Sequence, residues 1–449
     1  SLKVRCNCGV QDRSLKGVMT RNAHTSENED QVSQLSNMLN IDKKLYQCPG
    51  HKPWYGSLNS KENCDSYPVA EFKNSINVYY PNTISSIYLP GGNPAVEQII
   101  EMFELNGVTS SWLNVTDKLE NKIELVKKLC PPEISEFKNH DIELAILYIT
   151  GSLGNEEQTQ DKLNTNSREM DLRNKEYEKL TDEVDTPNLK VRKEWNARDE
   201  KYQLSNYFNV LNRVTKLKET IALIGFNRLN DNGNNNNITL EQGKKLLFQE
   251  PQLSKNNWLP AYKVYGEGIF FTLNFKSLSE WENRQDVKGY FNKFLTRIEA
   301  QDRPIDESAI NPRNVLIHTL SHVILEELAL TCGYNSTSMR ERLYIGNDYN
   351  GVVIYTSSGN IEGTFGGLVR MGKKENFFSV VYKAIDKARW CSSDPVCSEI
   401  GKTSGQGFNN LNGAACHSCS YLPETSCEFG NLFLDRTLLI DPEIGFFNM

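Results

Sequence analysis

Two clusters of cysteines lie near opposite ends of this 449-residue chain, and their spacing suggests metal chemistry. Close pairs such as Cys416 and Cys419 suit a metal ion, because two thiolates on one tight turn can share one tetrahedral ion. Disulfides are the alternative. The long cysteine-poor middle and the absence of a recognisable secretion signal favour metal binding. The clusters consist of Cys6, Cys8, Cys48 and Cys64, and of Cys391, Cys397, Cys416, Cys419 and Cys427.

Zinc is the metal that these thiol-rich clusters predict, with one structural ion at each end. The C-terminal cluster offers five cysteines where a tetrahedral site needs four. We predict that Cys391, Cys397, Cys416 and Cys419 bind the ion, because these two short-range pairs close the smallest loops. Cys427 is the alternative fourth ligand. Cys6, Cys8, Cys48 and Cys64 are predicted to form the N-terminal site.

A second set of candidate ligands lies on a predicted helix over residues 311–331. His318, His322 and Glu326 are one turn apart on one face, as a metal-dependent nuclease or hydrolase could use. The zincin motif is not matched, because Thr319 stands where that motif has Glu. The helix is apolar nearly all round, so histidines buried in a core are the simpler interpretation. A protein that is not an enzyme is therefore favoured.

A glycine-rich segment over residues 363–367 follows a predicted strand and could cradle a phosphate. The Lys-Ser/Thr pair of a P-loop is missing, because Leu368 and Val369 come next. We therefore expect the chain alone not to hydrolyse ATP. Basic residues in and around this region are the candidates for contacts with DNA phosphates, with a solvated basic surface as the alternative: Arg340, Arg342, Arg370, Lys373 and Lys374.

The composition is that of a soluble globular protein, with 38% hydrophobic and 24% charged residues. No apolar run approaches the roughly 18 residues that a membrane helix needs, so we expect no membrane partner and a cytoplasmic location. The net charge of −7 is concentrated in residues 94–200, which hold 23 acidic and 14 basic residues. The overall charge does not indicate a nucleic-acid binder, but it leaves room for local basic surfaces.

The elements that position these groups follow from periodicity and capping signals. Helices are expected over 95–105, after Thr116 as far as Pro131, over 311–331 and over 375–390. A charged helix within 155–200 should dock through Leu172, Tyr177 and Leu180. A helix from 203 should lead into a strand at 221–226, and further strands are expected within 264–275 and 351–356.

These elements predict a multi-domain α+β protein with four regions. An N-terminal zinc-binding region covers 1–90, and a helical, acidic middle region covers 91–200. An α+β region covers 201–310. A C-terminal mixed α/β domain covers 311–449 and is closed by the four-cysteine zinc site.

Several segments resemble one known family. His318–His322, Arg340–Tyr344, Gly363–Val369 and Cys391–Arg436 are similar to the C-terminal zinc-binding domain shared by MrfA-type helicases and the DrmB family. Segments elsewhere resemble the DrmB family of DISARM antiphage defence, so the likeness spans essentially the whole chain. These segments are Cys6–Gly9, Pro53–Gly56, Asn77–Pro81, Leu172–Tyr177, Ile224–Leu229 and Tyr265–Phe270.

The resemblance implies a subunit without a helicase motor. Such a subunit pairs with a DrmA-like superfamily 2 helicase, and the pair engages phage DNA, for which a single-stranded form or end is one option. Further defence subunits could join the complex. Family members extend further toward the N-terminus with another cysteine- and histidine-bearing segment, and this chain starts at Ser1. We therefore expect it to be part of a longer protein.

Overall fold

A computed structural model gives the fold of most of the chain. It describes residues 3–4, 13–14, 80–89, 93–114, 116, 118–150, 165–202, 204–227, 259–299, 310–346, 349–357, 366–407 and 410–447. The predicted N-terminal ligands Cys6, Cys8, Cys48 and Cys64 lie outside these residues. The chain divides into two compact units, one of residues 1–85 with 221–262 and the other of residues 86–220 with 263–449. Every site residue described below belongs to the second unit.

Runs of helices and runs of strands follow one another along the described chain, which makes the protein a mixture of α and β structure, as predicted. The helices are α2 (Pro94–Leu105), α3 (Ser110–Leu113), α4 (Leu119–Leu129), α5 (Asn139–Ile149), α6 (Thr165–Thr181), α8 (Phe275–Glu282), α9 (Gln285–Glu299), α10 (Pro312–Cys332), α11 (Gly367–Met371), α12 (Lys374–Ala388), α13 (Val396–Lys402) and α14 (Thr437–Ile440), with 3₁₀ turns η5 (Pro132–Glu136) and η8 (Ser336–Ser338).

A seven-stranded sheet runs in the order β4-β5-β6-β7-β9-β8, and β3 also pairs with β6. The pairs β4–β5, β5–β6, β7–β9 and β8–β9 are antiparallel. Because these strands come from all four predicted regions, the sheet spans the predicted boundaries at 90, 200 and 310. The strands are β3 (Tyr80–Ile87), β4 (Val184–Asp185), β5 (Leu189–Asn196), β6 (Phe208–Asn227), β7 (Ala261–Leu273), β8 (Met339–Ile345) and β9 (Asn350–Thr356), and a separate antiparallel pair is formed by β1 (Lys3–Val4) and β2 (Arg13–Ser14).

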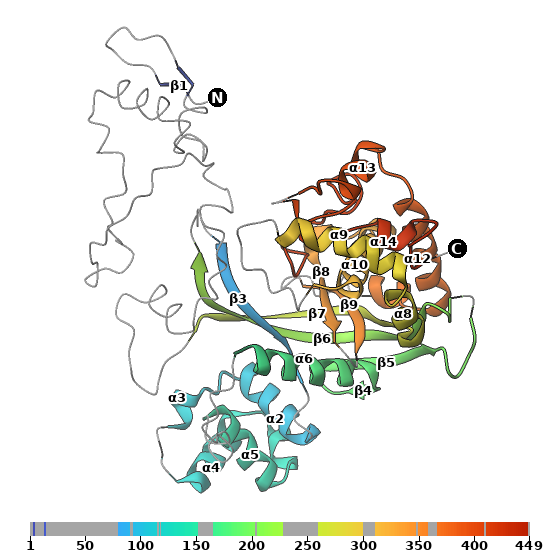
Figure 1. Ribbon diagram of the computed structural model, residues 1–449. Coiled ribbons are helices and arrows are strands. Elements are labelled where there is room, and N and C mark those ends of the chain that lie inside the picture. Colours follow the sequence, from blue (N-terminus) through green and yellow to red (C-terminus); the bar gives the residue numbers. More distant parts are fainter. Residues whose placement is uncertain are drawn as a thin grey trace. The chain divides into compact units, whose positions relative to one another are not determined.

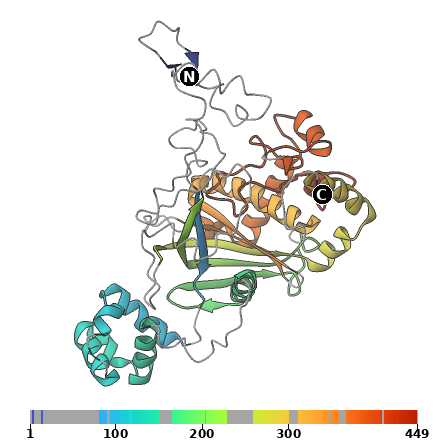
Figure 2. The ribbon, with the colours of Figure 1, turned by 60° about the vertical axis from the view of Figure 1, so that its left-hand side comes forward.

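Both faces of this sheet are covered by helices. Figures 1 and 2 show α10 and α12 over one face and α6 over the other. Alternate residues of a strand point to opposite faces, so Phe271 of β7 packs in the core beneath α10 whereas Phe270 packs with Tyr177 and Leu180 of α6. Tyr177 and Leu180 therefore lie on the docking face that was predicted for the charged helix, whereas the third predicted residue, Leu172, is not part of this cluster.

The central helix α10 agrees with its predicted bounds. The side chain of Asn311 caps it by accepting a hydrogen bond from the Asn314 amide at 2.9 Å, and Gly333 ends it with a φ of 72°. Among the described helices, α10 alone is long and apolar enough to cross a membrane. It is mostly buried inside the protein, as the core helix of a soluble domain would be.

The helix predicted from residue 203 is wrong, because residues 208–227 form the long strand β6. Val210, Val214 and Thr215 are β-branched and favour strand backbone. The strand lies between covered faces, so apolar residues fall on both of its sides and the alternation that marks a half-exposed strand is missing. The segment predicted to hold a strand pair, 264–275, forms most of the single strand β7.

The predicted helical middle region contains a small helical cluster with a core of its own. Ile99 and Phe103 of α2 pack there with Val126 of α4 and Ile142 and Ile146 of α5. The helix predicted after Thr116 begins at Leu119 and ends at Leu129, directly before Cys130 and Pro131.

Candidate metal centre

The four cysteines predicted from spacing come together at the end of the chain. The Sγ atom of Cys391 lies 3.6 Å from that of Cys416, which in turn lies 3.7 Å from that of Cys419. Cys397 Sγ lies 4.0 Å from Cys419 Sγ. Four thiolates around one zinc at a Zn–S distance of about 2.3 Å would be about 3.8 Å apart in a tetrahedron. The cluster therefore fits a single tetrahedral Zn²⁺ ion, and Cys427 is not part of it.

Amide groups surround the four sulfur atoms. The Ser393, Ser418 and Cys416 backbone amides donate to Cys391, Cys416 and Cys419 Sγ at 3.4, 3.4 and 3.3 Å. The Gln406 side-chain amide donates to Cys397 Sγ at 3.4 Å. Hydrogen bonds of this kind stabilise thiolate over thiol and orient the ligands of a metal.

Two thiols of the cluster have pKa values that are shifted in opposite directions. A hydrogen bond with the Cys419 thiol, followed by one from Gln406, lowers the pKa of Cys397. The same Cys397–Cys419 hydrogen bond raises the pKa of Cys419.

Arg436 and Asp394 fasten the first cysteine pair to the end of α12. The guanidinium of Arg436 donates to the carbonyl of Ala388 at 3.0 Å and forms a short ion pair with Asp394. The other Asp394 oxygen accepts from the Cys391 amide at 3.1 Å. The turn that presents Cys391 is thus held by a residue 45 positions later in the chain.

Asp435, the neighbour of Arg436, ties the second cysteine pair to the core. Its carboxylate is buried and accepts from the Ala414 amide at 3.0 Å and from the Tyr290 hydroxyl at 2.6 Å. A β-carbon on Gly413 would lie 2.1 Å from this carboxylate, so only glycine fits there. The Asp435 amide donates to Thr319 of α10 at 2.9 Å.

The predicted set of His318, His322 and Glu326 is only partly brought together. The two imidazole rings are 4.5 Å apart, but the Glu326 carboxylate lies elsewhere, 2.9 Å from the Lys387 ammonium, and is 40% exposed. Glu341 of β8 and Cys427 take its place beside the histidines, and the four ligand atoms lie within 4.8 Å of one another. The proposed nuclease or hydrolase site is therefore not assembled from the predicted residues.

The glycine-rich segment is described from Gly366 onward, and its amide groups already have an internal partner. Gly366 and Leu368 both donate to the buried carboxylate of Glu267, the latter at 2.8 Å, and the Tyr334 hydroxyl also donates to it at 3.1 Å. A protein carboxylate thus occupies the position that a phosphate would need. Nothing in the local sequence indicated this partner, because Glu267 lies about one hundred residues earlier.

The predicted DNA-binding residues differ widely in exposure. Arg370 and Lys373 are exposed, whereas the Lys374 ammonium lies 2.7 Å from Glu200 and packs over the ring of Tyr202. Arg340 is partly exposed and lies 3.8 Å from the carboxylate of Glu219.

Arg342 has to be removed from the DNA-binding set. Its side chain is 3% exposed, and its guanidinium donates to both carboxylate oxygens of Glu176, at 2.7 and 2.8 Å. The Tyr344 hydroxyl donates to the same carboxylate at 3.1 Å. Because a phosphate cannot reach a side chain that is buried in this way, Arg342 joins β8 to α6 instead.

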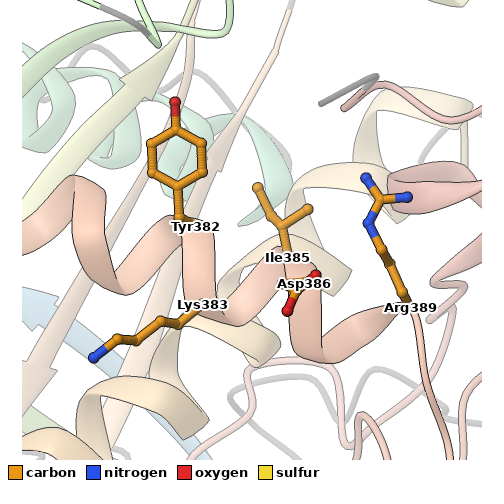
Figure 3. A pocket seen from close by; sticks show the side chains of 5 residues that line it. All are labelled: Tyr382, Lys383, Ile385, Asp386 and Arg389. Atoms are coloured by element: carbon orange, nitrogen blue, oxygen red, sulfur yellow. The ribbon is translucent and has the colours of Figure 1, made fainter.

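A surface hollow of about 410 Å³ lies along α12. Figure 3 shows that the helix presents the side chains of Tyr382, Lys383, Ile385, Asp386 and Arg389 there, and that the two cationic groups point in different directions. The hollow is lined by no cysteine or histidine, so it is separate from both groups of candidate metal ligands.

Two comparisons place these features among known proteins. The MrfA Zn-binding domain matches residues 320–420, a range that includes Cys391, Cys397, Cys416 and Cys419. The DISARM protein DrmB of Bacillus paralicheniformis is 30% identical over an alignment of 460 residues, which covers 98% of this chain and 72% of the relative.

Proposed function

Because the chain belongs to the DrmB family of DISARM proteins, we propose that it is the zinc-binding, non-catalytic partner subunit of a DrmA-like superfamily 2 helicase in bacterial antiphage defence. The observation that carries this proposal is a likeness along nearly the whole chain, combined with a four-cysteine cluster inside the matched zinc-binding domain. The subunit would act in the cytoplasm, brace the helicase and help to bind phage DNA, with further defence subunits joining them.

Zinc in this proposal is structural. Cys391, Cys397, Cys416 and Cys419 supply four protein ligands, which leaves no open position for a substrate. The ion would bind the closing segment, defined as residues 391–447, to the end of α12. The described part of this segment holds two short helices, α13 and α14. Leu438, Leu439 and Phe447 pack into the main core, and a metal ion would cross-link the loops that carry the four cysteines.

In this proposal, the DNA phosphates are contacted by exposed basic side chains that follow the glycine-rich segment. Arg370 and Lys373 are exposed side chains beside the start of α12. Cations in such positions bind phosphates as point charges, without reading base sequence. Arg340 pairs with Tyr355 in the sheet and lies beside Glu219 on the α6 side, so it is a separate candidate, and Lys374 would first have to leave Glu200.

Changing Arg370 and Lys373 together to Ala should weaken DNA binding by the complex of this chain with its helicase. Each lost phosphate contact should flatten the slope of log affinity against log salt by about 0.7–0.9, because fewer counterions are released. A fluorescence titration at several salt concentrations measures this slope.

The matched control removes the same charge from another surface. Lys276 of α8 and Lys293 of α9 are both exposed, and changing both to Ala should leave the slope as it is in the wild-type complex. Equal slopes for the two double variants would show that the Arg370 surface is a solvated basic patch without a ligand.

The purified chain should not hydrolyse ATP, because the glycine-rich segment lacks the phosphate-binding lysine. In addition, the Gly366 and Leu368 amides already donate hydrogen bonds to the carboxylate of Glu267. Release of inorganic phosphate is the measurement, with the helicase alone as the positive control. ATP hydrolysis by a preparation that mass spectrometry shows to be free of helicase would contradict the proposed division of labour.

A further inference from the structure

Four buried side chains from three separate elements converge at one point beneath the sheet-covering helix α10. His318 and His322 come from α10, Glu341 from β8, and Cys427 from the closing segment. A Glu341 oxygen lies 3.2 Å from Nε2 of each histidine, and His318 Nε2 lies 3.2 Å from Cys427 Sγ. Ligands of one tetrahedral zinc ion would be about 3.3 Å apart for imidazole nitrogen and carboxylate oxygen, and about 3.6 Å apart for imidazole nitrogen and thiolate, so the spacing is close to that of a zinc site.

The hydrogen bond made by the Nδ1 atom of His322 shows how this ring is oriented. Its Nδ1 atom lies 2.7 Å from the backbone carbonyl of Ser420, which can only accept, so Nδ1 carries a proton. In the neutral ring Nε2 is then unprotonated and directs its lone pair at the Glu341 carboxylate. Two lone pairs at 3.2 Å repel each other unless a proton or a metal ion lies between them. In metal-bound histidines, the ring nitrogen that faces away from the metal commonly donates a hydrogen bond to a backbone carbonyl in this way.

The two anionic candidates are held in the same way. The Asn431 amide donates to Cys427 Sγ at 3.2 Å, and the Glu428 amide donates to the Glu341 carboxylate at 3.3 Å. The Ser321 hydroxyl makes a short hydrogen bond to the other Glu341 oxygen. The Glu341 and Cys427 ligand atoms are thus each held by a backbone amide, as the ligands of a metal ion commonly are.

Charge balance also favours a divalent cation. With zinc bound, the Cys427 thiol is deprotonated, so a thiolate and a carboxylate bring two negative charges into a site where all four residues are buried. Buried charges are costly unless they are paired or coordinate a metal. One Zn²⁺ ion makes the site neutral, and nitrogen, oxygen and sulfur donors together are typical of zinc.

We propose that His318, His322, Glu341 and Cys427 bind a zinc ion of their own, separate from the ion of the four-cysteine cluster. All four positions are filled by protein and buried, so the site is structural. It joins α10, β8 and the closing segment. Ser420, which supports His322, directly follows Cys419, so the two metal sites share one short stretch of chain.

The test is the zinc content of the full chain, measured by elemental mass spectrometry. Changing Cys427 to Ser should lower it by about one zinc per chain. The control is Cys332 to Ser, which removes a partly buried thiol at the end of α10 and should change nothing. A folded Cys427→Ser protein with as much zinc as the control would overturn the proposal.

A second measurement decides the matter if Cys427→Ser does not fold. X-ray absorption at the zinc edge can be recorded on a chain with Cys6 and Cys8 changed to Ser, which removes the other predicted site. A zinc shell that contains imidazole nitrogen is the expected result. A shell of sulfur alone, as the four-cysteine cluster gives by itself, would overturn the proposal.

Discussion

Changing Cys416 or Cys419 to Ser should release the zinc ion of the four-cysteine cluster and unfold the closing segment. The expected loss is on the order of 10 kcal/mol of binding energy that otherwise stabilises this segment. Serine is nearly the same size as cysteine, so the loss of a thiolate, rather than a change in packing, is the cause. Zinc content and limited proteolysis of the full chain measure the effect, with insoluble protein as the extreme outcome.

The other thiols provide the controls for this prediction. Cys332→Ser should keep both the zinc and the protease resistance of the wild-type chain. Cys427→Ser should be milder than Cys416→Ser and leave an all-sulfur zinc site in place. A well-folded Cys416→Ser protein with its full zinc content would contradict the ligand assignment.

Changing Arg342 to Met should destabilise the second unit by about 3–5 kcal/mol, because Glu176 then remains as a buried charge without its partner. The pair lies between α6 and β8, so the contact between this helix and the sheet should weaken first. Glu176 also accepts hydrogen bonds from Tyr344 and from the Ile87 amide, which partly offset the loss. The shift of the unfolding midpoint in urea measures the effect.

An exposed ion pair supplies the comparison. Arg192 pairs with Asp185 at the surface, and Arg192→Met should barely move the midpoint, because water screens such pairs. A stable Arg342→Met protein that binds DNA more weakly would instead restore Arg342 as a DNA contact.

Local sequence signals were sufficient where neighbouring residues do the chemistry. The pairing of Cys391 with Cys397 and of Cys416 with Cys419 predicted a cluster that the fold assembles. Asn311 and Gly333 predicted the ends of α10, because caps are local interactions.

Local sequence signals failed to identify interaction partners that are distant in the chain. Glu341 lies 19 residues after His322, on a strand rather than on the same helix, and Glu326 was chosen from helical spacing alone. One signal could have found it: Glu341 falls between Met339 and Leu343 on the inward face of a strand, where a charged residue needs a partner. Arg342 was misassigned for the same reason, because Glu176 lies 166 residues away.

Association of this chain with a DrmA-like helicase is the most direct measurement of the proposed function. The two proteins, this chain purified with its zinc, can be mixed and passed through a sizing column with light scattering, and the fractions assayed for DNA-dependent ATP hydrolysis. We expect them to elute as one complex, with ATP hydrolysis by the complex and by the helicase but not by this chain alone. Separate elution of the two folded proteins would contradict the proposed role as a helicase partner.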